Sequence, residues 1–201
     1  MPELSPEEMD LLIHRFKEAT REQMKRLRSA TPAPALRARS ARIADAVRAL
    51  PEFQRARAVL GYVAIRGEAD VSSLERDVRA RGGRWILPRV EGEALALHEI
   101  PKGAALAPGA FGIPEPSPDS PRVRPEEIDF VLVPALAVDA AGRRIGWGGG
   151  FYDRILPSLA CAFRCAVVYD FQLIAEAPGA PHDVAVDAVV SERSSFVIER
   201  E

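Results

Sequence analysis

The sequence is poor in cysteine, histidine and lysine, and it contains no long apolar run. Cys161 and Cys165 are the two cysteines among 201 residues, too few for a disulfide framework or a four-ligand zinc site. The three histidines are scattered, without the spacing of metal ligands. No apolar segment approaches the roughly 18 residues of a membrane helix, and the first residues lack the basic and apolar regions of a signal peptide. These absences predict a cytoplasmic protein that makes no contact with a membrane.

Charge of either sign is also not in excess. Lysine and arginine number 27 against 29 aspartates and glutamates, a net charge of −2, which argues against a dedicated nucleic-acid binder. Hydrophobic residues make up 47% of the chain and charged residues 28%, so wholesale disorder is excluded. The length predicts a single domain over residues 1–201.

Apolar spacing predicts an α/β fold. Two helices are expected first, over residues 6–29 and from the break at 32–34 to Leu50, where Pro51 ends the second. Later helices are expected at 72–81 and 151–159. Short apolar runs typical of buried strands lie at 58–64, 85–87 (ended by Pro88), 94–99, 128–133, 163–169 and 187–190. Seven of the 17 prolines fall between residues 101 and 125, which predicts an irregular segment.

The alternation of strands and helices predicts a three-layer, Rossmann-like domain. Its central sheet is expected to be mostly parallel, with helices on both faces and the two N-terminal helices packed against it. In such folds ligands bind beyond the carboxyl ends of the strands.

A glycine-rich turn at residues 142–150 follows the strand at 128–133 and contains five of the 14 glycines. Glycine lets backbone N–H groups approach an anion closely, and a following helix adds partial positive charge. Arg143 and Arg144 bring fixed charge to the same turn. The run matches neither common nucleotide-binding fingerprint. We favour a phosphate-binding turn here, with a plain flexible connection as the alternative.

The turn, read with the residues after it, resembles a known signature. GRRIGWGGGFYDR at 142–154 is similar to the motif of the 5-formyltetrahydrofolate cyclo-ligase (5,10-methenyltetrahydrofolate synthetase) family. Further stretches resemble that family in the same order: Lys17 with Arg21, Gly67 with Glu68, 87–89, 111–116, 133–136, and Val186 with Asp187. The resemblance spans about residues 17–190.

The resemblance implies a reaction. ATP and Mg²⁺ would support closure of the 5-formyl group of 5-formyltetrahydrofolate onto N10, giving 5,10-methenyltetrahydrofolate, ADP and phosphate. The formyl oxygen would be phosphorylated, and N10 would then attack the activated carbon. Such chemistry depends on positioning and charge neutralisation, so no covalent or acid–base residue is expected. The implied partners are small molecules, ATP and folate with or without a polyglutamate tail, and the chain is expected to be a monomer.

The resemblance also implies site residues. Lys17, Arg21 and Lys25 would bind ATP; their four-residue spacing places them on one helical stripe, although a solvated basic face is the alternative. The remaining ATP residues would be Arg143, Arg144, Ile145, Gly146, Trp147, Gly148, Gly149, Gly150, Phe151 and Tyr152. The folate would bind to Val63 and Glu68, and to Trp147, Gly148, Gly149, Gly150, Phe151 and Tyr152 of the same turn.

Asp153 and Asp187 match the Mg²⁺-associated carboxylates of the family. Mg²⁺ prefers hard oxygen ligands, and one or two carboxylates with phosphate oxygens are sufficient. The alternatives are stabilisation of a helix N-terminus by Asp153 and capping of a strand by Asp187.

Two other functions stay open. A non-catalytic folate- or nucleotide-binding relative is the first, because Trp147 stands where arginine or tyrosine is common in the family. An RNA- or protein-binding module that uses the arginine-rich N-terminal helix is the second, and the net charge of −2 argues against it.

Overall fold

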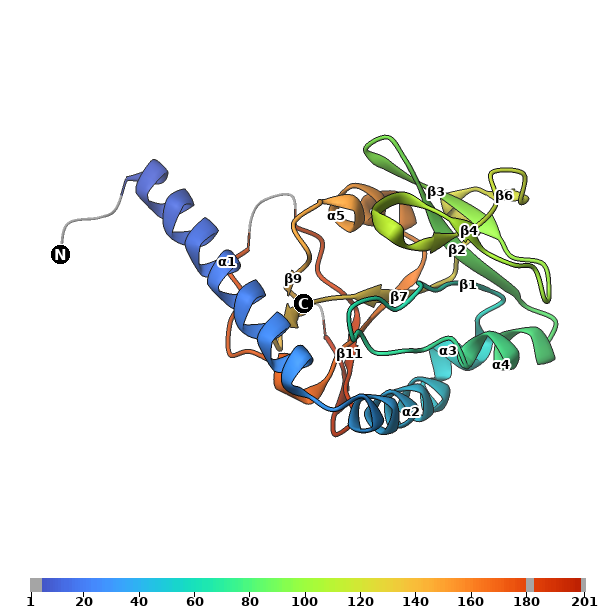
Figure 1. Cartoon of the computed structure of the whole chain (residues 1–201), viewed down its shortest axis with the longest axis horizontal. Coiled ribbons are helices and arrows are strands. Elements are labelled where there is room, and N and C mark those ends of the chain that lie inside the picture. The colour runs from blue at the N-terminus through green and yellow to red at the C-terminus, as the bar shows by residue number, and fades with distance from the viewer. Residues whose placement is uncertain (1–4, 180–182, 200–201) are drawn as a thin grey trace.

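A computed structural model describes residues 5–179 and 183–199, so His182 lies outside the described residues. Its centre is an eight-stranded sheet in the order β12-β11-β10-β7-β1-β2-β3-β6 (Figure 1). The strands are β1 (Ala58–Leu60), β2 (Arg84–Glu91), β3 (Ala94–Glu99), β6 (Arg122–Val123), β7 (Phe130–Pro134), β10 (Phe163–Val167), β11 (Ala188–Val190) and β12 (Ser195–Val197). The five strands from β11 to β2 run parallel, and antiparallel strands close both edges. The prediction of a mostly parallel sheet is confirmed.

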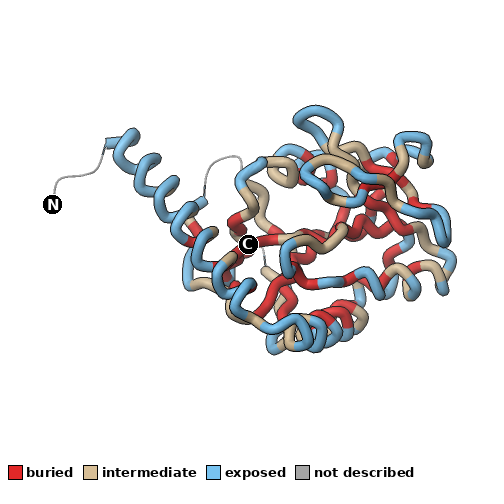
Figure 2. The backbone as a smooth tube through the Cα atoms, viewed as in Figure 1, coloured by how far each residue is buried: buried red, intermediate tan, exposed pale blue. Residues whose placement is uncertain are grey.

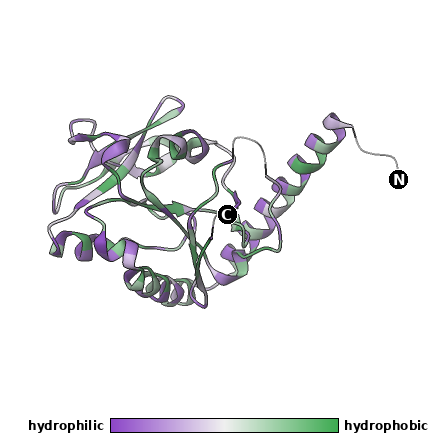
Figure 3. Ribbon diagram, turned by 180° about the vertical axis from the view of Figure 1, so that it is seen from behind, coloured by the Kyte–Doolittle hydropathy of each residue, from purple (hydrophilic) through white to green (hydrophobic). Residues whose placement is uncertain are grey.

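Helices cover both faces of the sheet, and each face has its own core. On one side lie α2 (Ala33–Ala49), α3 (Pro51–Arg55) and α4 (Leu74–Ala80), and on the other lies α5 (Phe151–Ile155), continued by the 3₁₀ turn Leu156–Leu159 (Figure 1). Phe130 and Leu132 of β7 pack towards the first group, whereas Val131 and Val133 pack towards the second. This alternation is the period of two that a strand buried on both faces requires. Figure 3 shows these strands as the apolar centre of the molecule.

The first helix, α1 (Pro6–Ala30), begins at a capping box. Ser5 Oγ accepts a hydrogen bond from the Glu8 N–H (3.2 Å), and the Glu8 carboxylate accepts one from the Ser5 N–H (2.8 Å). Its N-terminal half projects into solvent, as Figure 2 shows, and its buried residues Thr20, Met24 and Arg28 lie further along. Met24 packs against the small hairpin of β8 (Ala137–Val138) and β9 (Arg144–Ile145). The two N-terminal helices therefore attach differently: α2 packs on the central sheet, whereas α1 packs mainly on this hairpin beside it.

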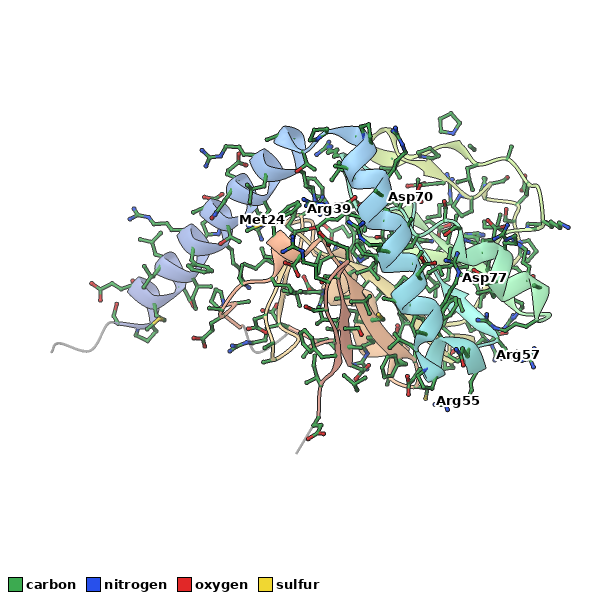
Figure 4. The ribbon with its side chains drawn as sticks, turned by 90° about the horizontal axis from the view of Figure 1, so that it is seen from below. Met24, Arg39, Arg55, Arg57, Asp70 and Asp77 are labelled. Atoms are coloured by element: carbon green, nitrogen blue, oxygen red, sulfur yellow. The ribbon has the colours of Figure 1, made fainter. Side chains whose placement is uncertain are left out.

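Pro51 follows the end of α2, as predicted, and also begins α3. It occupies the first turn of α3, where its fixed φ and missing N–H are tolerated. On the surface beside this junction, Arg48 of α2 binds Asp77 of α4 at 2.6 Å, and Figure 4 shows Asp77 where these two helices meet. The irregular segment between residues 101 and 125 is confirmed in outline, but it holds β4 (Ala107–Pro108), β5 (Pro114–Glu115) and the edge strand β6.

The prediction that Pro88 ends its strand is wrong, because β2 continues through it. The Gly61 N–H donates to Ile86 O at 2.9 Å on the β1 side of β2, and strand alternation places Pro88 on that same side. Since β1 already ends at Leu60, no neighbouring strand requires an N–H from Pro88. The strand predicted over 58–64 is correspondingly shorter, and the chain after Leu60 leaves the sheet.

The sheet therefore opens beyond the carboxyl ends of β1 and β7. The chain leaves β1 towards β2 on one side, whereas β7 and the later strands lie on the other side. Such a reversal of strand order creates a crevice at the carboxyl edge of an α/β sheet. No helix in the described part of the chain has both the length and the apolar content that crossing a bilayer demands.

Candidate active site

A pocket of about 610 Å³ lies at this reversal point, a volume that suits a small organic ligand. One wall is the inner stripe of α1, and the opposite walls come from the loop after β1 and from the aromatic segment near Phe111. The glycine turn and the start of α5 complete the lining. The lining includes 15 of the sequence-predicted residues: Lys17, Arg21, Lys25, Val63, Glu68, Arg144, Ile145, Gly146, Trp147, Gly148, Gly149, Gly150, Phe151, Tyr152 and Asp153.

Three cations of α1 face the pocket in a row. Lys17 Nζ lies 3.1 Å from an oxygen of Asp183, and both side chains are largely buried. Arg21 Nε donates to the carbonyl of Gly146 at 2.9 Å, and Lys25 Nζ lies 5.8 Å from the centre of the Trp147 ring. The solvated basic face considered as an alternative does not describe this stripe, because it contacts the glycine turn and the pocket.

The glycine turn has a backbone that side chains would restrict. Gly148 has a φ of +100° and Gly150 a φ of +68°, a region that favours glycine. A Cβ on Gly150 would come within 2.6 Å of the Arg154 guanidinium. The turn therefore brings its main chain close to the pocket, as an anion-binding loop must. The helix that follows it, α5, has only five residues, so its dipole adds less positive charge than the predicted longer helix would.

Glu68 places a buried carboxylate at the other side of the pocket. Its Oε1 accepts a hydrogen bond from Trp147 Nε1 at 2.7 Å, and its Oε2 accepts one from the Ile65 N–H at 3.1 Å. Arg28 Nη1 lies 3.8 Å from Oε1. Burial raises the pKa of Glu68, and the Trp147 and Ile65 hydrogen bonds and the Arg28 charge oppose that rise. Ionised, this carboxylate can accept two hydrogen bonds from one planar ligand edge.

Two tyrosines hold the loop that carries Glu68 in place. Tyr169 Oη donates to the Glu68 carbonyl at 3.0 Å and lies 3.1 Å from Ser40 Oγ. Tyr62 Oη donates to the carbonyl of Ala69 at 2.6 Å. These hydrogen bonds hold the main chain on both sides of the carboxylate, so Glu68 points into the pocket from a rigid support.

Arg144 and two aspartates form a charged group at the base of the glycine turn. The buried Arg144 side chain donates to Asp153 and to the carbonyl of Val184, and burial lowers its pKa while the charges of Asp153 and Asp183 oppose that change. Asp153 and Asp183 both line the pocket. Two carboxylates beside bound phosphates suit Mg²⁺, which needs few protein ligands. The described residues contain no group of three or more acidic, histidine or cysteine side chains placed for a metal.

Two of the predicted site residues, Arg143 and Asp187, are not among the described residues that line the pocket. The Arg143 side chain binds Asp139 (2.7 Å) and Glu176 (3.3 Å), and Gly142 before it belongs to the turn of the β8–β9 hairpin. Asp187 accepts a hydrogen bond from the Arg164 N–H (2.8 Å) at the amino end of β11, and its role in metal binding stays a prediction.

Aromatic side chains form the rim and the floor of the pocket. Phe111 is 72% exposed, has a φ of +57°, and meets the Phe151 ring edge to face at 6.0 Å. Tyr152 lies deeper; its hydroxyl is buried with no hydrogen-bond partner among the described residues. Burial raises the Tyr152 pKa, and the nearby Glu68 charge raises it further, so the hydroxyl stays protonated. An exposed aromatic in a strained backbone region suggests a ligand contact.

Among the lining or supporting residues that sequence reasoning missed are Arg28, Arg66, Phe111 and Asp183. Arg28 continues the α1 stripe by three residues beyond Lys25, which was the available signal. Phe111 lies in a segment that the sequence marks as irregular, and its placement depends on the loop conformation. No spacing pattern marks Asp183, because it lies four residues before Asp187 in a stretch without regular secondary structure.

Comparison with known proteins finds relatives along most of the chain. The model of the 5-formyltetrahydrofolate cyclo-ligase family matches residues 13–192. A 5-formyltetrahydrofolate cyclo-ligase of Mycolicibacterium smegmatis is 36% identical over 151 residues, which cover 72% of this chain and 78% of that relative. The protein of the same name from Escherichia coli (strain K12) is 32% identical over 148 residues, 70% of this chain and 81% of that one. The NMR structure of Aquifex aeolicus 5,10-methenyltetrahydrofolate synthetase superposes with a TM-score of 0.82 at 34% identity, covering 92% and 94% of the two chains.

Proposed function

Because the chain belongs to the 5-formyltetrahydrofolate cyclo-ligase family, we propose that it converts 5-formyltetrahydrofolate and ATP into 5,10-methenyltetrahydrofolate, ADP and phosphate. The single observation that carries the proposal is the composition of one pocket. A cation stripe and a glycine turn form one side, and a buried carboxylate, Glu68, forms the other. A triphosphate suits the first side, and the amino and N–H edge of a pterin suits the second.

The reaction needs the formyl oxygen to become a leaving group. In the proposed course this oxygen attacks the γ-phosphorus of ATP, and the bond from that phosphorus to the β–γ bridging oxygen breaks to release ADP. N10 then attacks the formyl carbon, loses its proton, and phosphate leaves with the former formyl oxygen. Each step is helped by orientation and by neutralisation of charge on the phosphoryl oxygens. No covalent side chain is required, and the described residues of the pocket lining offer no paired nucleophile and base.

The chain's own residues would divide this work between them. Lys17, Arg21 and Lys25 would hold the triphosphate, with backbone N–H groups of the turn at 146–150 close to the transferred group. Glu68 would orient the pterin, and Phe111 with Phe151 would cover the ring system at the rim. Tyr152, protonated and without a partner among the described residues, could donate a hydrogen bond to a bound ligand.

Asp153 and Asp183 are the residues that would hold Mg²⁺. Both line the pocket beside Arg144, and Lys17 adjoins Asp183, so a bound metal would sit next to the triphosphate side. When bound there, Mg²⁺ supplies charge neutralisation for the phosphate oxygens. Asp183 is thus a candidate metal ligand beside Asp153 and the predicted Asp187.

The test is formation of the methenyl absorbance band after the protein is mixed with 5-formyltetrahydrofolate, ATP and Mg²⁺. We expect an increase that requires both ATP and Mg²⁺ and that is lost in Asp153→Ala. Asp119→Ala is the matched control, since Asp119 is an exposed aspartate outside the pocket lining. No increase with the wild-type protein, with calorimetric binding of both ligands retained, would refute the reaction and favour a non-catalytic relative.

A further inference from the structure

Trp147 places its indole ring against the carboxylate that we assign to the pterin. Its Nε1 donates to Glu68 Oε1 at 2.7 Å, while Glu68 Oε2 accepts a hydrogen bond from the Ile65 N–H at 3.1 Å. Both oxygens are therefore already engaged by donors of the protein itself. A pterin presents similar chemistry, a planar bicyclic ring with N–H donors along its edge. The indole thus occupies part of the position that the substrate ring requires.

The loop that carries Trp147 is held by cations that we assign to the nucleotide. Arg21 Nε donates to the carbonyl of Gly146 at 2.9 Å, and the Arg21 guanidinium also lies close to Gly148. Lys25 Nζ lies 5.8 Å from the centre of the Trp147 ring, within range of a cation–π contact. Phosphate oxygens are stronger acceptors for both cations than a carbonyl or a ring face. A bound triphosphate would therefore compete directly with the contacts that fix this loop.

The loop has few side chains of its own to hold it in place. Four of its five residues at 146–150 are glycine, and a Cβ on Gly146 would meet nothing within 4 Å. The Trp147 side chain packs against the small apolar cluster that includes Ile145, and the exposed Arg66 places its guanidinium 5.2 Å from the ring centre. Loss of the Arg21 and Lys25 contacts would leave this packing, the flanking arginines and the hydrogen bond to Glu68, so fewer contacts would then oppose displacement of the indole by a ligand.

We propose that Trp147 sets the order of ligand binding: it caps Glu68 in the nucleotide-free protein and uncaps it when a nucleotide draws Arg21 and Lys25 to its phosphates. This inference rests on the proposed function, because it uses the assignment of Glu68 to the folate. It predicts that nucleotide and folate bind with positive coupling, and that the coupling depends on the indole N–H.

The test is a set of calorimetric titrations with 5-formyltetrahydrofolate, with and without AMP-PNP and Mg²⁺. For the wild-type protein we expect the nucleotide analogue to tighten folate binding about tenfold, the effect of one hydrogen bond to a charged acceptor. For Trp147→Phe, which keeps a ring but has no N–H, we expect folate binding about tenfold tighter without the analogue and less than a twofold further effect with it. Trp85→Phe is the matched control, because Trp85 is the other tryptophan and lies buried in the core; it should keep the wild-type ratio.

Two results would overturn the inference. Weaker folate binding by Trp147→Phe in the absence of nucleotide would mean that the indole assists the substrate, and an unchanged coupling ratio would mean that the indole N–H plays no part. Should Trp147→Phe unfold, Trp147→Leu, which also has no donor, tests the same ratio, with thermal unfolding as the check on the fold. Failure of the proposed reaction is a separate result, since it shows in the absence of methenyl product from the wild-type protein, whatever the binding ratios are.

Discussion

Replacement of Glu68 by glutamine tests the folate assignment most directly. The change keeps the shape of the side chain and removes its charge, so that one of its two oxygens becomes an N–H₂ donor. That donor would face Trp147 Nε1 or the Ile65 N–H, both of which are donors themselves. A pterin edge would lose one charge-assisted hydrogen bond and keep a weaker neutral one. The expected loss is about 2–3 kcal/mol, or about 30- to 150-fold in the folate dissociation constant.

Calorimetric titration of Glu68→Gln with 5-formyltetrahydrofolate measures this loss, and titration with AMP-PNP measures whether the nucleotide side is intact. We expect the nucleotide affinity to change less than about threefold, because Lys17, Arg21 and Arg144 keep their positions. Asp70→Asn is the matched control, an exposed carboxylate two residues along the same loop whose oxygen caps the Ser72 N–H at 2.9 Å. Equal folate affinity in Glu68→Gln and the wild-type protein would refute the assignment.

Three further outcomes are expected. Folate binding should require ionised Glu68, whose pKa burial raises above the ordinary 4.5. As the pH decreases, kcat/KM for the folate should therefore begin to fall already above pH 4.5, and Glu68→Gln should not show this decrease. Lys17→Ala should raise the KM for ATP about tenfold or more with a smaller effect on folate affinity, since it removes a cation from the triphosphate side; equal effects on both ligands would contradict this. Asp153→Asn and Asp183→Asn should each raise the Mg²⁺ concentration for half-maximal rate, whereas Asp119→Asn should leave it unchanged. Metal titrations in which Asp187→Asn raises that concentration and Asp183→Asn does not would favour the predicted pair Asp153 and Asp187.

Much of the sheet could be predicted from the sequence because its strands are short and apolar on both faces. The run at 128–133 and the strands at 163–167 and 188–190 needed no knowledge of their neighbours. The end of β1 could not be predicted in this way, since residues 61–64 are as apolar as those before them. Only the strand pairing shows that β1 ends at Leu60 while β2 continues without β1 beside it. The missing neighbour on that side is also why Pro88 is tolerated in β2.

The candidate site likewise contains residues that local spacing predicts and residues that it does not. The α1 stripe and the glycine turn follow from local spacing, and the structure brings both to one pocket. Arg143 and Arg144 were different, because these two neighbouring arginines point to opposite sides. In the β8–β9 hairpin, strand alternation turns Arg144 towards Asp153 and leaves Arg143 with Asp139. Asp183 lines the pocket from the irregular stretch before β11, whose path the sequence does not encode locally.

The way α1 is attached gives its cations unequal reach. The helix is anchored by Met24 and Arg28 near its C-terminal end, while its outer half stands in solvent. Along the helix axis, at 1.5 Å per residue, Lys17 lies about 21 Å from Thr31 and Lys25 lies about 9 Å from it. A given tilt moves Lys17 more than twice as far as Lys25. The ion pair between Lys17 and Asp183 joins the far part of the helix to the body of the protein, and together with the Arg21 hydrogen bond to Gly146 it fixes the angle at which the row of cations meets the pocket.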